Sequence, residues 1–229
     1  MSDLKINQRQ IEEVKQQTKV PGLALDIDET LSDTTAFYFD HMQKQFGKLE
    51  DLSTRELIKK YRYSYRVPQW QHEEAKQFHD ELRHDDSVQE DFELLENCNE
   101  AVNKVNQLIP IVAYVTTRPE AVVNGTRRWL AKHNFPDKPI IARPAGLTYE
   151  QVNTWKARVL ELLYPEVLGI IDDHPDMIGN LDKNYKGVIF YYNAPKHIEA
   201  KVRVYPSKTW EDIYQNVKHF TETKTNAAH

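Results

Sequence analysis

The 229-residue sequence contains one cysteine, Cys98, and only seven glycines. A single cysteine excludes an intrachain disulfide framework, and a chain without disulfides suits a reducing compartment. Cys98 lies in a polar segment with a helical pattern, so we interpret it as an inert thiol rather than a nucleophile. The chain must therefore be held together by an apolar core, which 40% hydrophobic residues can supply.

Long hydrophobic runs are also missing. No apolar stretch approaches the roughly 20 residues that a membrane-spanning helix needs, and residues 1–20 are too polar for a secretory signal. The formal net charge of -5 gives no general attraction to nucleic acid or to an anionic membrane. We therefore expect a cytoplasmic protein whose partners include no nucleic acid and no membrane. The sequence leaves the oligomeric state open.

Short apolar runs alternate with helical patterns over most of the chain. The runs cover residues 23–27, 111–115, 139–142, 167–171 and 187–191. Continuous apolar strands separated by helices are typical of a parallel sheet that is covered on both faces. The sequence therefore predicts an α/β fold with a doubly wound, Rossmann-like parallel sheet. We assign residues 1–32 and 105–220 to this core, and residues 221–229 to a flexible tail.

Residues 33–104 carry helical patterns and no strand pattern. Aromatic residues recur at helical spacing from Phe37 to Phe46. The segment from Ser53 to Glu56 has the sequence of a capping box, which indicates the start of a second helix. Pro68 suits the first turn of a third helix. We therefore predict an α-helical insertion in the core.

Polar residues follow the apolar runs, where the strands are predicted to end. Ligands of open parallel sheets bind beyond the carboxyl ends of the strands, so these residues mark the candidate site. They are Asp26, Asp28, Thr30, Thr116, Thr117, Arg118, Arg143, Asp172, Asp173 and Asp176.

The aspartates of this set need a compensating charge. Asp26, Asp28 and Asp172 would repel one another at close range unless a cation lies between them. Oxygen ligands favour Mg²⁺ over zinc or copper, and Mg²⁺ commonly shares substrate phosphate oxygens. Aspartates also cap turns and helices, which explains Asp173 or Asp176 alone equally well. For the pair Asp26 and Asp28 at the end of an apolar strand, we favour a metal site.

Four segments, in order, resemble the motifs of the haloacid dehalogenase superfamily. Leu23 to Leu31 is an apolar strand followed by Asp-x-Asp-x-Thr, and Ile111 to Thr116 is a strand that ends in threonine. Lys156 lies on a predicted helix, and Leu168 to Asp173 is a strand that ends in two aspartates. The resemblance implies the fold of that superfamily.

The resemblance also implies a chemical role for several residues. Asp26 would be the nucleophile that forms an aspartyl-phosphate. Asp28 would protonate the leaving alkoxide and later help to deprotonate the attacking water. Thr116 and Lys156, together with Thr117, would bind the oxygens of the phosphoryl group.

A Mg²⁺ cofactor is part of the same resemblance. Asp26 would bind the metal through its carboxylate, and Asp28 through its backbone carbonyl. Asp172 would complete the ligand shell, with Asp173 or Asp176 contributing directly, through water or from outside the shell.

The second aspartate, Asp28, indicates a phosphatase or a phosphomutase, because dehalogenase members lack it. The departure from the family pattern is Glu29, where many members have glycine. The insertion resembles a helical C1 cap, which implies a small phosphorylated substrate such as a nucleotide, phosphosugar or phosphoacid. The Thr-Thr-Arg-Pro and Ala-Arg-Pro segments resemble those of proteins related to 5′(3′)-deoxyribonucleotidases, so we favour a 5′-nucleotidase.

Other functions compete with this hypothesis. A β-phosphomutase-like enzyme would use the same residues but would return the phosphoryl group to its substrate. A non-catalytic binding module would keep the fold without turnover. A nucleic-acid 3′-phosphatase is disfavoured by the net charge and by the size of the insertion.

Several further residues allow two interpretations. Arg118 would either neutralise substrate charge or pair with an acid of the core, and Arg143 would either bind substrate or serve the structure. The basic and aromatic run 59–66 would either stack a base or cover the core with its tyrosines. A group of histidines shows no metal-ligand spacing and is predicted on the surface: His41, His72, His79 and His84.

Overall fold

A computed structural model describes residues 4–195 and 199–227 and contains a six-stranded parallel sheet with the order β3-β2-β1-β4-β5-β6. The strands are β1 (Gly22–Leu25), β2 (Ile111–Pro119), β3 (Ile140–Arg143), β4 (Val167–Asp172), β5 (Val188–Tyr191) and β6 (Arg203–Pro206). The predicted α/β class with a doubly wound parallel sheet is confirmed.

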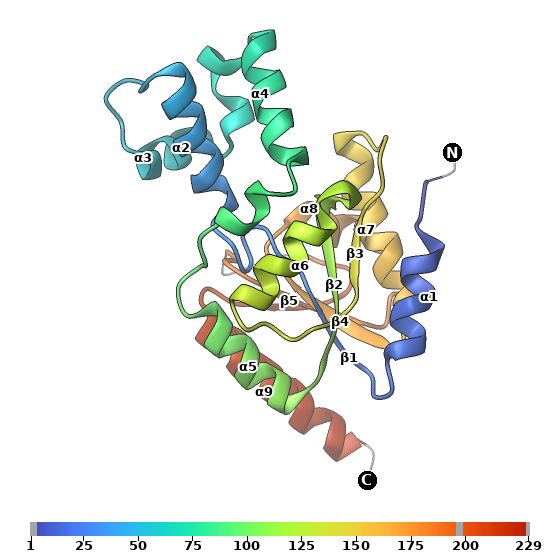
Figure 1. Cartoon of the computed structure of the whole chain (residues 1–229). Helices are drawn as coiled ribbons and strands as arrows, with labels where there is room; N and C mark the ends of the chain where they lie inside the picture. Colours follow the sequence, from blue (N-terminus) through green and yellow to red (C-terminus); the bar gives the residue numbers. More distant parts are fainter. Residues whose placement is uncertain (1–3, 196–198, 228–229) are drawn as a thin grey trace.

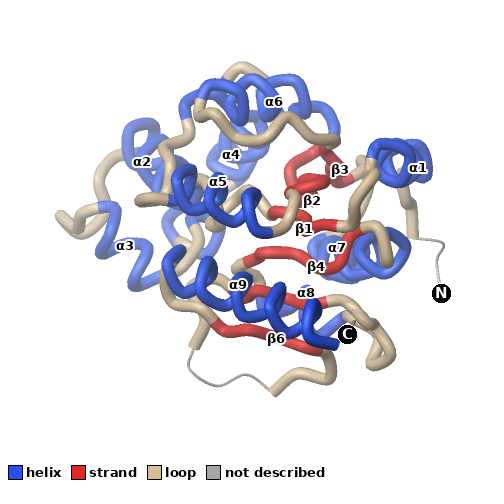
Figure 2. Tube along the Cα trace, turned by 90° about the horizontal axis from the view of Figure 1, so that it is seen from below, coloured by secondary structure: helices blue, strands red, loops and turns tan. Residues whose placement is uncertain are grey.

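Helices cover both faces of the sheet (Figures 1 and 2). Buried residues of one face pack against α5 (Cys98–Leu108), α6 (Val123–Lys132) and α9 (Trp210–Ala227). Those of the other face pack against α1 (Gln8–Gln17), α7 (Tyr149–Leu163) and α8 (Pro175–Asn180). Alternate residues of β1 point to opposite faces, so Leu23 and Leu25 join the first cluster and Ala24 joins the second. The sheet is therefore buried on both sides, which explains its continuous apolar strands.

The chain progresses across the sheet in opposite directions on the two sides of the boundary between the adjacent strands β1 and β4. From β1 the chain proceeds through β2 to β3 on one side, and from β4 through β5 to β6 on the other. A crevice opens beyond the carboxyl ends of the strands at such a switch point. Asp26 follows β1 directly, and Asp172 is the last residue of β4. The topology alone thus brings these two carboxylates together.

The segment between Asp33 and Glu93, which we call the helical insertion, contains no strand. It includes α2 (Thr34–Phe46), α3 (Thr54–Tyr61), α4 (Glu73–His84) and the 3-10 turns Ser64–Arg66, Pro68–Trp70 and Val88–Asp91. The predicted capping box begins α3, with the Ser53 backbone N–H donating to Glu56 Oε2 at 2.8 Å. The helix predicted from Pro68 is instead a 3-10 turn followed by α4, which His72 caps.

The helical insertion has a hydrophobic cluster of its own, formed by Phe39, Met42, Leu57, Val67, Trp70 and Ala75. Its two ends lie side by side at the core. Asp33 N–H donates to Glu93 O at 2.8 Å, and Leu95 N–H donates to Leu31 O at 2.9 Å. The predicted boundary at residue 104 falls inside α5, whose buried residues pack with α9 and the sheet. We therefore place the return to the core at Leu95.

The structure differs from the sequence prediction at two further points. The strand β6 was not predicted, because as an edge strand it has partly exposed residues and no apolar run. The helix α9 continues to Ala227, which corrects the assignment of residues 221–227 to a tail. Those residues include no glycine or proline that would end a helix.

None of the described helices is long and apolar enough to cross a bilayer.

The single cysteine, Cys98, is buried. Its thiol donates to Leu31 O at 3.3 Å, and burial raises its pKa to about 12. The thiol form therefore predominates, in agreement with an inert cysteine.

Candidate active site

Three carboxylates meet at the switch point of the sheet. Asp26, Asp172 and Asp173 each offer an oxygen, and these oxygens lie within 4.8 Å of one another. Asp26 and Asp172 are 4% and 0% exposed. Thr30, one turn beyond β1, donates to Asp173 at 3.3 Å and to Asp26 at 3.4 Å. A buried group of like charges requires cations nearby.

One cation is Lys156, which α7 carries into the site. Its ammonium lies 2.6 Å from Asp26 Oδ1 and 2.6 Å from Asp172 Oδ2, and the residue is 1% exposed. Burial disfavours the charged lysine, but Asp172 and Asp26 outweigh this effect and raise the pKa of the ammonium. Lys156 is therefore a permanent positive charge between two buried acids.

Lys156 does not neutralise the whole acidic group. Burial raises the pKa of Asp26 to about 7, with Lys156 opposing and Asp172 reinforcing the shift. Burial and the neighbouring Asp26 also raise the pKa of Asp173 well above its ordinary range. These shifts mean that the protein alone keeps Asp26 and Asp173 ionised only at a cost in free energy.

The shortage of positive charge around these carboxylates fits a divalent cation. The three carboxylates are hard oxygen donors of the kind that Mg²⁺ prefers, and one ammonium faces them. Asp172 Oδ2 is buried, and the Lys156 ammonium lies 2.6 Å from it. A metal ion beside this oxygen would add a second cation and stabilise the ionised forms of Asp26 and Asp173.

Asp28 lies on the next turn and pairs with Arg118 from the end of β2. Its Oδ1 accepts hydrogen bonds from Arg118 Nε and from the Thr34 hydroxyl, both at 2.8 Å. Arg118 is buried, and its guanidinium lies 4.7 Å from the ring centre of Phe92 and 5.6 Å from that of Trp129. Burial of Asp28 is outweighed by Arg118, which lowers the pKa of this carboxyl. Arg118 therefore pairs with an acid of the core.

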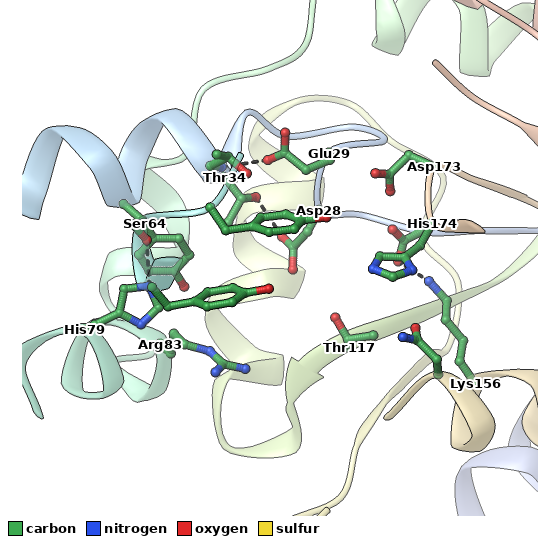
Figure 3. A pocket seen from close by; sticks show the side chains of 16 residues that line it. Asp28, Glu29, Thr34, Ser64, His79, Arg83, Thr117, Lys156, Asp173 and His174 are labelled. Atoms are coloured by element: carbon green, nitrogen blue, oxygen red, sulfur yellow. Dashed lines mark hydrogen bonds and ion pairs between the residues drawn. The ribbon is translucent and has the colours of Figure 1, made fainter. Parts of the chain in front are cut away.

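A cavity of about 570 Å³ opens from this group of charges towards the helical insertion. Figure 3 shows Lys156 and Asp173 on one side, Ser64, His79 and Arg83 on the opposite side, and Thr117 between them. The lining from the core comprises Asp26, Asp28, Glu29, Thr117, Asn153, Lys156, Asp173 and His174. The lining from the helical insertion comprises Thr34, Thr35, Tyr38, Tyr63, Ser64, Tyr65, His79 and Arg83.

No family model matches this chain, and no curated protein matches its sequence. Solved structures do match. A dehalogenase crystallised with an intermediate complex is 13% identical, with a TM-score of 0.50, over 86% of this chain and 98% of that chain. A HAD-superfamily hydrolase from Ehrlichia chaffeensis is 16% identical (TM-score 0.47; 88% and 98% covered). Cytosolic 5′-nucleotidase IIIB bound to cytidine is 14% identical (TM-score 0.40; 96% and 94% covered).

The chain has the haloacid dehalogenase fold. The predicted motif segments occupy the strand ends that the fold brings together, with Asp26 beyond β1, Asp172 at the end of β4 and Lys156 on α7 between them. At identities this low, the likeness to solved structures concerns the fold alone.

Glu29, the departure from the common sequence of this fold, adopts a φ of 58°. Glycine reaches this left-handed region without strain, whereas other residues pay of order 1–3 kcal/mol. The Glu29 carboxylate accepts a hydrogen bond from Thr35 N–H at 2.6 Å, at the start of α2. Burial raises the pKa of Glu29 to about 7. The side chain thus joins the acidic turn to the first helix of the insertion.

The other candidate residues from the sequence are less closely grouped. Thr117 lines the cavity, whereas Thr116 is fully buried and its hydroxyl accepts from Arg118 N–H at 3.2 Å. Arg143 Nε donates to Thr117 O at 3.1 Å and so supports this end of β2. The exposed Asp176, in the first turn of α8, lies outside the acidic cluster found among the described residues.

The sequence prediction missed most of the lining that comes from the insertion. His79 was predicted on the surface, but it lines the cavity, and its Nε2 lies 3.0 Å from the Ser64 hydroxyl. Burial and the nearby Arg83 lower the pKa of His79 to about 4. The run 59–66 contributes Tyr63, Ser64 and Tyr65. The alternation of basic and aromatic residues in this run was the one feature of the sequence that indicated a role for the insertion in binding.

Proposed function

We propose that this protein is a Mg²⁺-dependent phosphatase that hydrolyses a small phosphomonoester through an aspartyl-phosphate intermediate. The main support is the position of Asp26, which is buried at the switch point with the Lys156 ammonium at 2.6 Å and opens on a cavity. A structural aspartate would not need a cavity. The fold class is compatible with this reaction, but the proposal depends on the side chains.

The metal would be held by the carboxylates of Asp26, Asp172 and Asp173, with the backbone carbonyl of Asp28 as a further ligand. Bound Mg²⁺ would offset the charge of the phosphoryl oxygens and keep nearby carboxylates ionised. Lys156 would bind a phosphoryl oxygen from the opposite direction. Thr117, which lines the cavity next to buried Thr116, would donate to another oxygen.

The first chemical step would be attack by an Asp26 carboxylate oxygen on phosphorus. A new bond joins that oxygen to phosphorus, and the bond from phosphorus to the substrate oxygen breaks. Asp28 protonates the departing oxygen, which leaves as an alcohol. In the second step water attacks phosphorus, Asp28 takes the proton, and the bond to Asp26 breaks. Inorganic phosphate is released and both aspartates return to their initial state.

The ion pair with Arg118 bears on the two tasks of Asp28. Because Arg118 favours the ionised carboxylate, Asp28 is in the form that can accept a proton from water, although its lowered pKa makes it a weaker base. Proton donation requires the neutral acid instead. A phosphate dianion bound beside Asp26 raises the pKa of neighbouring carboxyls, so we assign protonation of Asp28 to the substrate complex. Arg118 and Thr34 both donate to Oδ1 of Asp28, so that proton would be carried by Oδ2.

The substrate class is a small phosphorylated metabolite, because the helical insertion lines one side of the cavity and limits the space beside Asp26. Nucleoside 5′-monophosphates, phosphosugars and phosphoacids all belong to this class, and a 5′-nucleotidase remains the prediction from sequence. A phosphomutase of β-phosphoglucomutase type would use the same residues. Phosphate release distinguishes the two, since a mutase isomerises a phosphosugar without net release.

The direct test is phosphate release from p-nitrophenyl phosphate with Mg²⁺ and with excess EDTA. We expect turnover only with Mg²⁺, and a loss of at least about 10³-fold in kcat for Asp26→Asn. Asp137→Asn is the matched control, because Asp137 is exposed and its one ion pair among the described residues is with Arg127 at 3.3 Å. Near-normal activity of Asp26→Asn would exclude Asp26 as the nucleophile. An inactive wild-type protein with intact fold would support a binding module.

A further inference from the structure

The cavity contains a second cationic group, far from Lys156. Arg83, near the end of α4, lines the cavity on the side of the helical insertion. Figure 3 shows its guanidinium directed into the cavity, on the opposite side from Lys156 and Asp173, with Thr117 between them. A ligand held at its phosphoryl end by Lys156 would therefore extend towards Arg83.

Arg83 differs from the other arginines of the helical insertion. Arg55 pairs with Asp33 at 2.5 Å, and Arg62 and Arg66 lie over the Tyr63 ring at 5.2 and 5.1 Å. Among residues 4–195 and 199–227, Arg83 has no hydrogen-bond or ion-pair partner. A half-buried guanidinium with five unused donors is suited to a planar anion.

The charged and titratable groups around Arg83 also bear on its ability to bind an anion. The nearest acid on its own helix, Asp80, instead lies 3.4 Å from His84. Burial and Arg83 together lower the pKa of Arg143, so these two guanidiniums lie close enough to repel each other. His79 is neutral above about pH 4 and contributes no charge. Asp80 opposes this positive charge in part, since it acts on both His79 and Arg143, but it forms no ion pair with Arg83.

We propose that Arg83 binds a second anionic group of the substrate, a carboxylate or a second phosphate, at the end remote from the scissile phosphate. The substrate would be a phosphomonoester with two acidic groups, bound with its scissile phosphate at Lys156. The identity of that substrate as a phosphomonoester rests on the proposed function. The anion site at Arg83 does not, because it is a property of the cavity wall.

A competing role for Arg83 is to balance the acidic centre from a distance. In that case its charge would strengthen binding of every phosphorylated ligand by a similar factor. A specific site predicts a gain only for ligands that carry a second anion at the right distance. Matched ligands therefore separate the two roles.

The probes are non-hydrolysable phosphonates, measured by calorimetry on the full chain with Mg²⁺. Each ω-carboxyalkyl phosphonate with two to four carbons is compared with the alkyl phosphonate of the same length, and with the corresponding α,ω-bisphosphonate. We expect at least a tenfold tighter Kd for one doubly anionic series at one chain length. The better series distinguishes a carboxylate from a second phosphate.

Variants assign the gain to Arg83. Arg83→Gln should remove the tenfold advantage of the second anion while leaving the Kd of alkyl phosphonates within about twofold. Arg83→Lys should retain part of the advantage, since it keeps the charge without the planar fork. Lys76→Gln removes the same charge from the exposed side of α4 and should change neither value.

Two results would overturn the anion site: equal affinities within every matched pair, or an advantage that survives in Arg83→Gln. Because the readout is binding, its failure is separate from failure of the catalytic proposal. A protein that prefers doubly anionic phosphonates but never hydrolyses an aryl phosphate would refute the phosphatase and keep the site. Thermal melting of each variant verifies that the fold is retained.

Discussion

The two sides of the cavity are built in different ways. On the core side, charged groups form ion pairs with one another: Lys156 with Asp26 and Asp172, and buried Arg118 with Asp28, whose side chain is 25% exposed. On the side of the helical insertion, the lining is aromatic and partly exposed, and its one cation, Arg83, has no ion-pair partner among the residues described. Under the proposed function, the core side would carry the chemistry and the insertion side the recognition of the substrate.

The difference follows from the supporting structure. Parallel strands fix the positions of residues at their ends, and buried charges persist only where partners are provided. The helical insertion packs on a small cluster of its own and touches the core mainly near its two ends. Changes on the core side should therefore affect stability and reaction rate, whereas changes in the insertion should affect mainly affinity or local stability.

The largest effect is expected for Lys156→Gln. Asp26 and Asp172 would be left buried without their cation, so the free energy of unfolding without Mg²⁺ should fall by about 3–5 kcal/mol. Urea denaturation followed by circular dichroism measures this loss, and added Mg²⁺ should restore part of it. Lys186→Gln on the surface is the control. A loss below about 1 kcal/mol would contradict the stabilising role of the ion pairs.

Asp28→Asn should separate chemistry from binding. An alkyl phosphate has a poor leaving group, so its kcat/KM should fall by about 10²–10⁴-fold. The loss for p-nitrophenyl phosphate should be smaller, because its leaving group departs without a proton. The quantity to measure is kcat/KM, which reports the step up to departure of the alcohol. Equal losses for both substrates would argue against proton donation by Asp28.

His79→Gln tests the insertion side of the cavity through the pH dependence of the free energy of unfolding. The pKa of His79 is about 4 in the folded protein and about 6.5 in the unfolded chain. Between these values the unfolded state binds more protons, so the stability contributed by neutral His79 is lost as pH falls from 6.5 to 4. This loss, of order 1–2 kcal/mol after solvent screening, should be absent in the variant. Urea denaturation across this range measures it, with His84→Gln on the same helix as control. Parallel pH curves for wild type and His79→Gln would refute the shift.

The smallest effect is expected for Ser53→Ala, which removes the capping box of α3. The loss should be about 1 kcal/mol of helix stability, visible as faster hydrogen exchange in residues 54–61. Hydrolysis of p-nitrophenyl phosphate should not change, since Ser53 lies outside the cavity lining. A change in kcat would show that the two sides are more closely coupled than the packing indicates.

The core side was far easier to predict from the sequence than the insertion side. Apolar runs ending in Asp26 and Asp172 identify strand ends, and the topology then determines where those ends meet. Arg83 and His79 have no comparable local signal. Both lie on an amphipathic helix, and whether they face solvent or a cavity depends on how that helix packs against the core. The edge strand β6 was missed for a related reason, because partial exposure removes its apolar pattern.

The paired hydrogen bonds between residues 31–33 and 93–95 have a consequence for how such a protein can diversify. The chain leaves the sheet and returns to it at practically one place. Lengthening, shortening or exchanging what lies between these crossings need not alter the register of any strand. Ligand preference can therefore drift over evolutionary time while the reacting groups stay where they are.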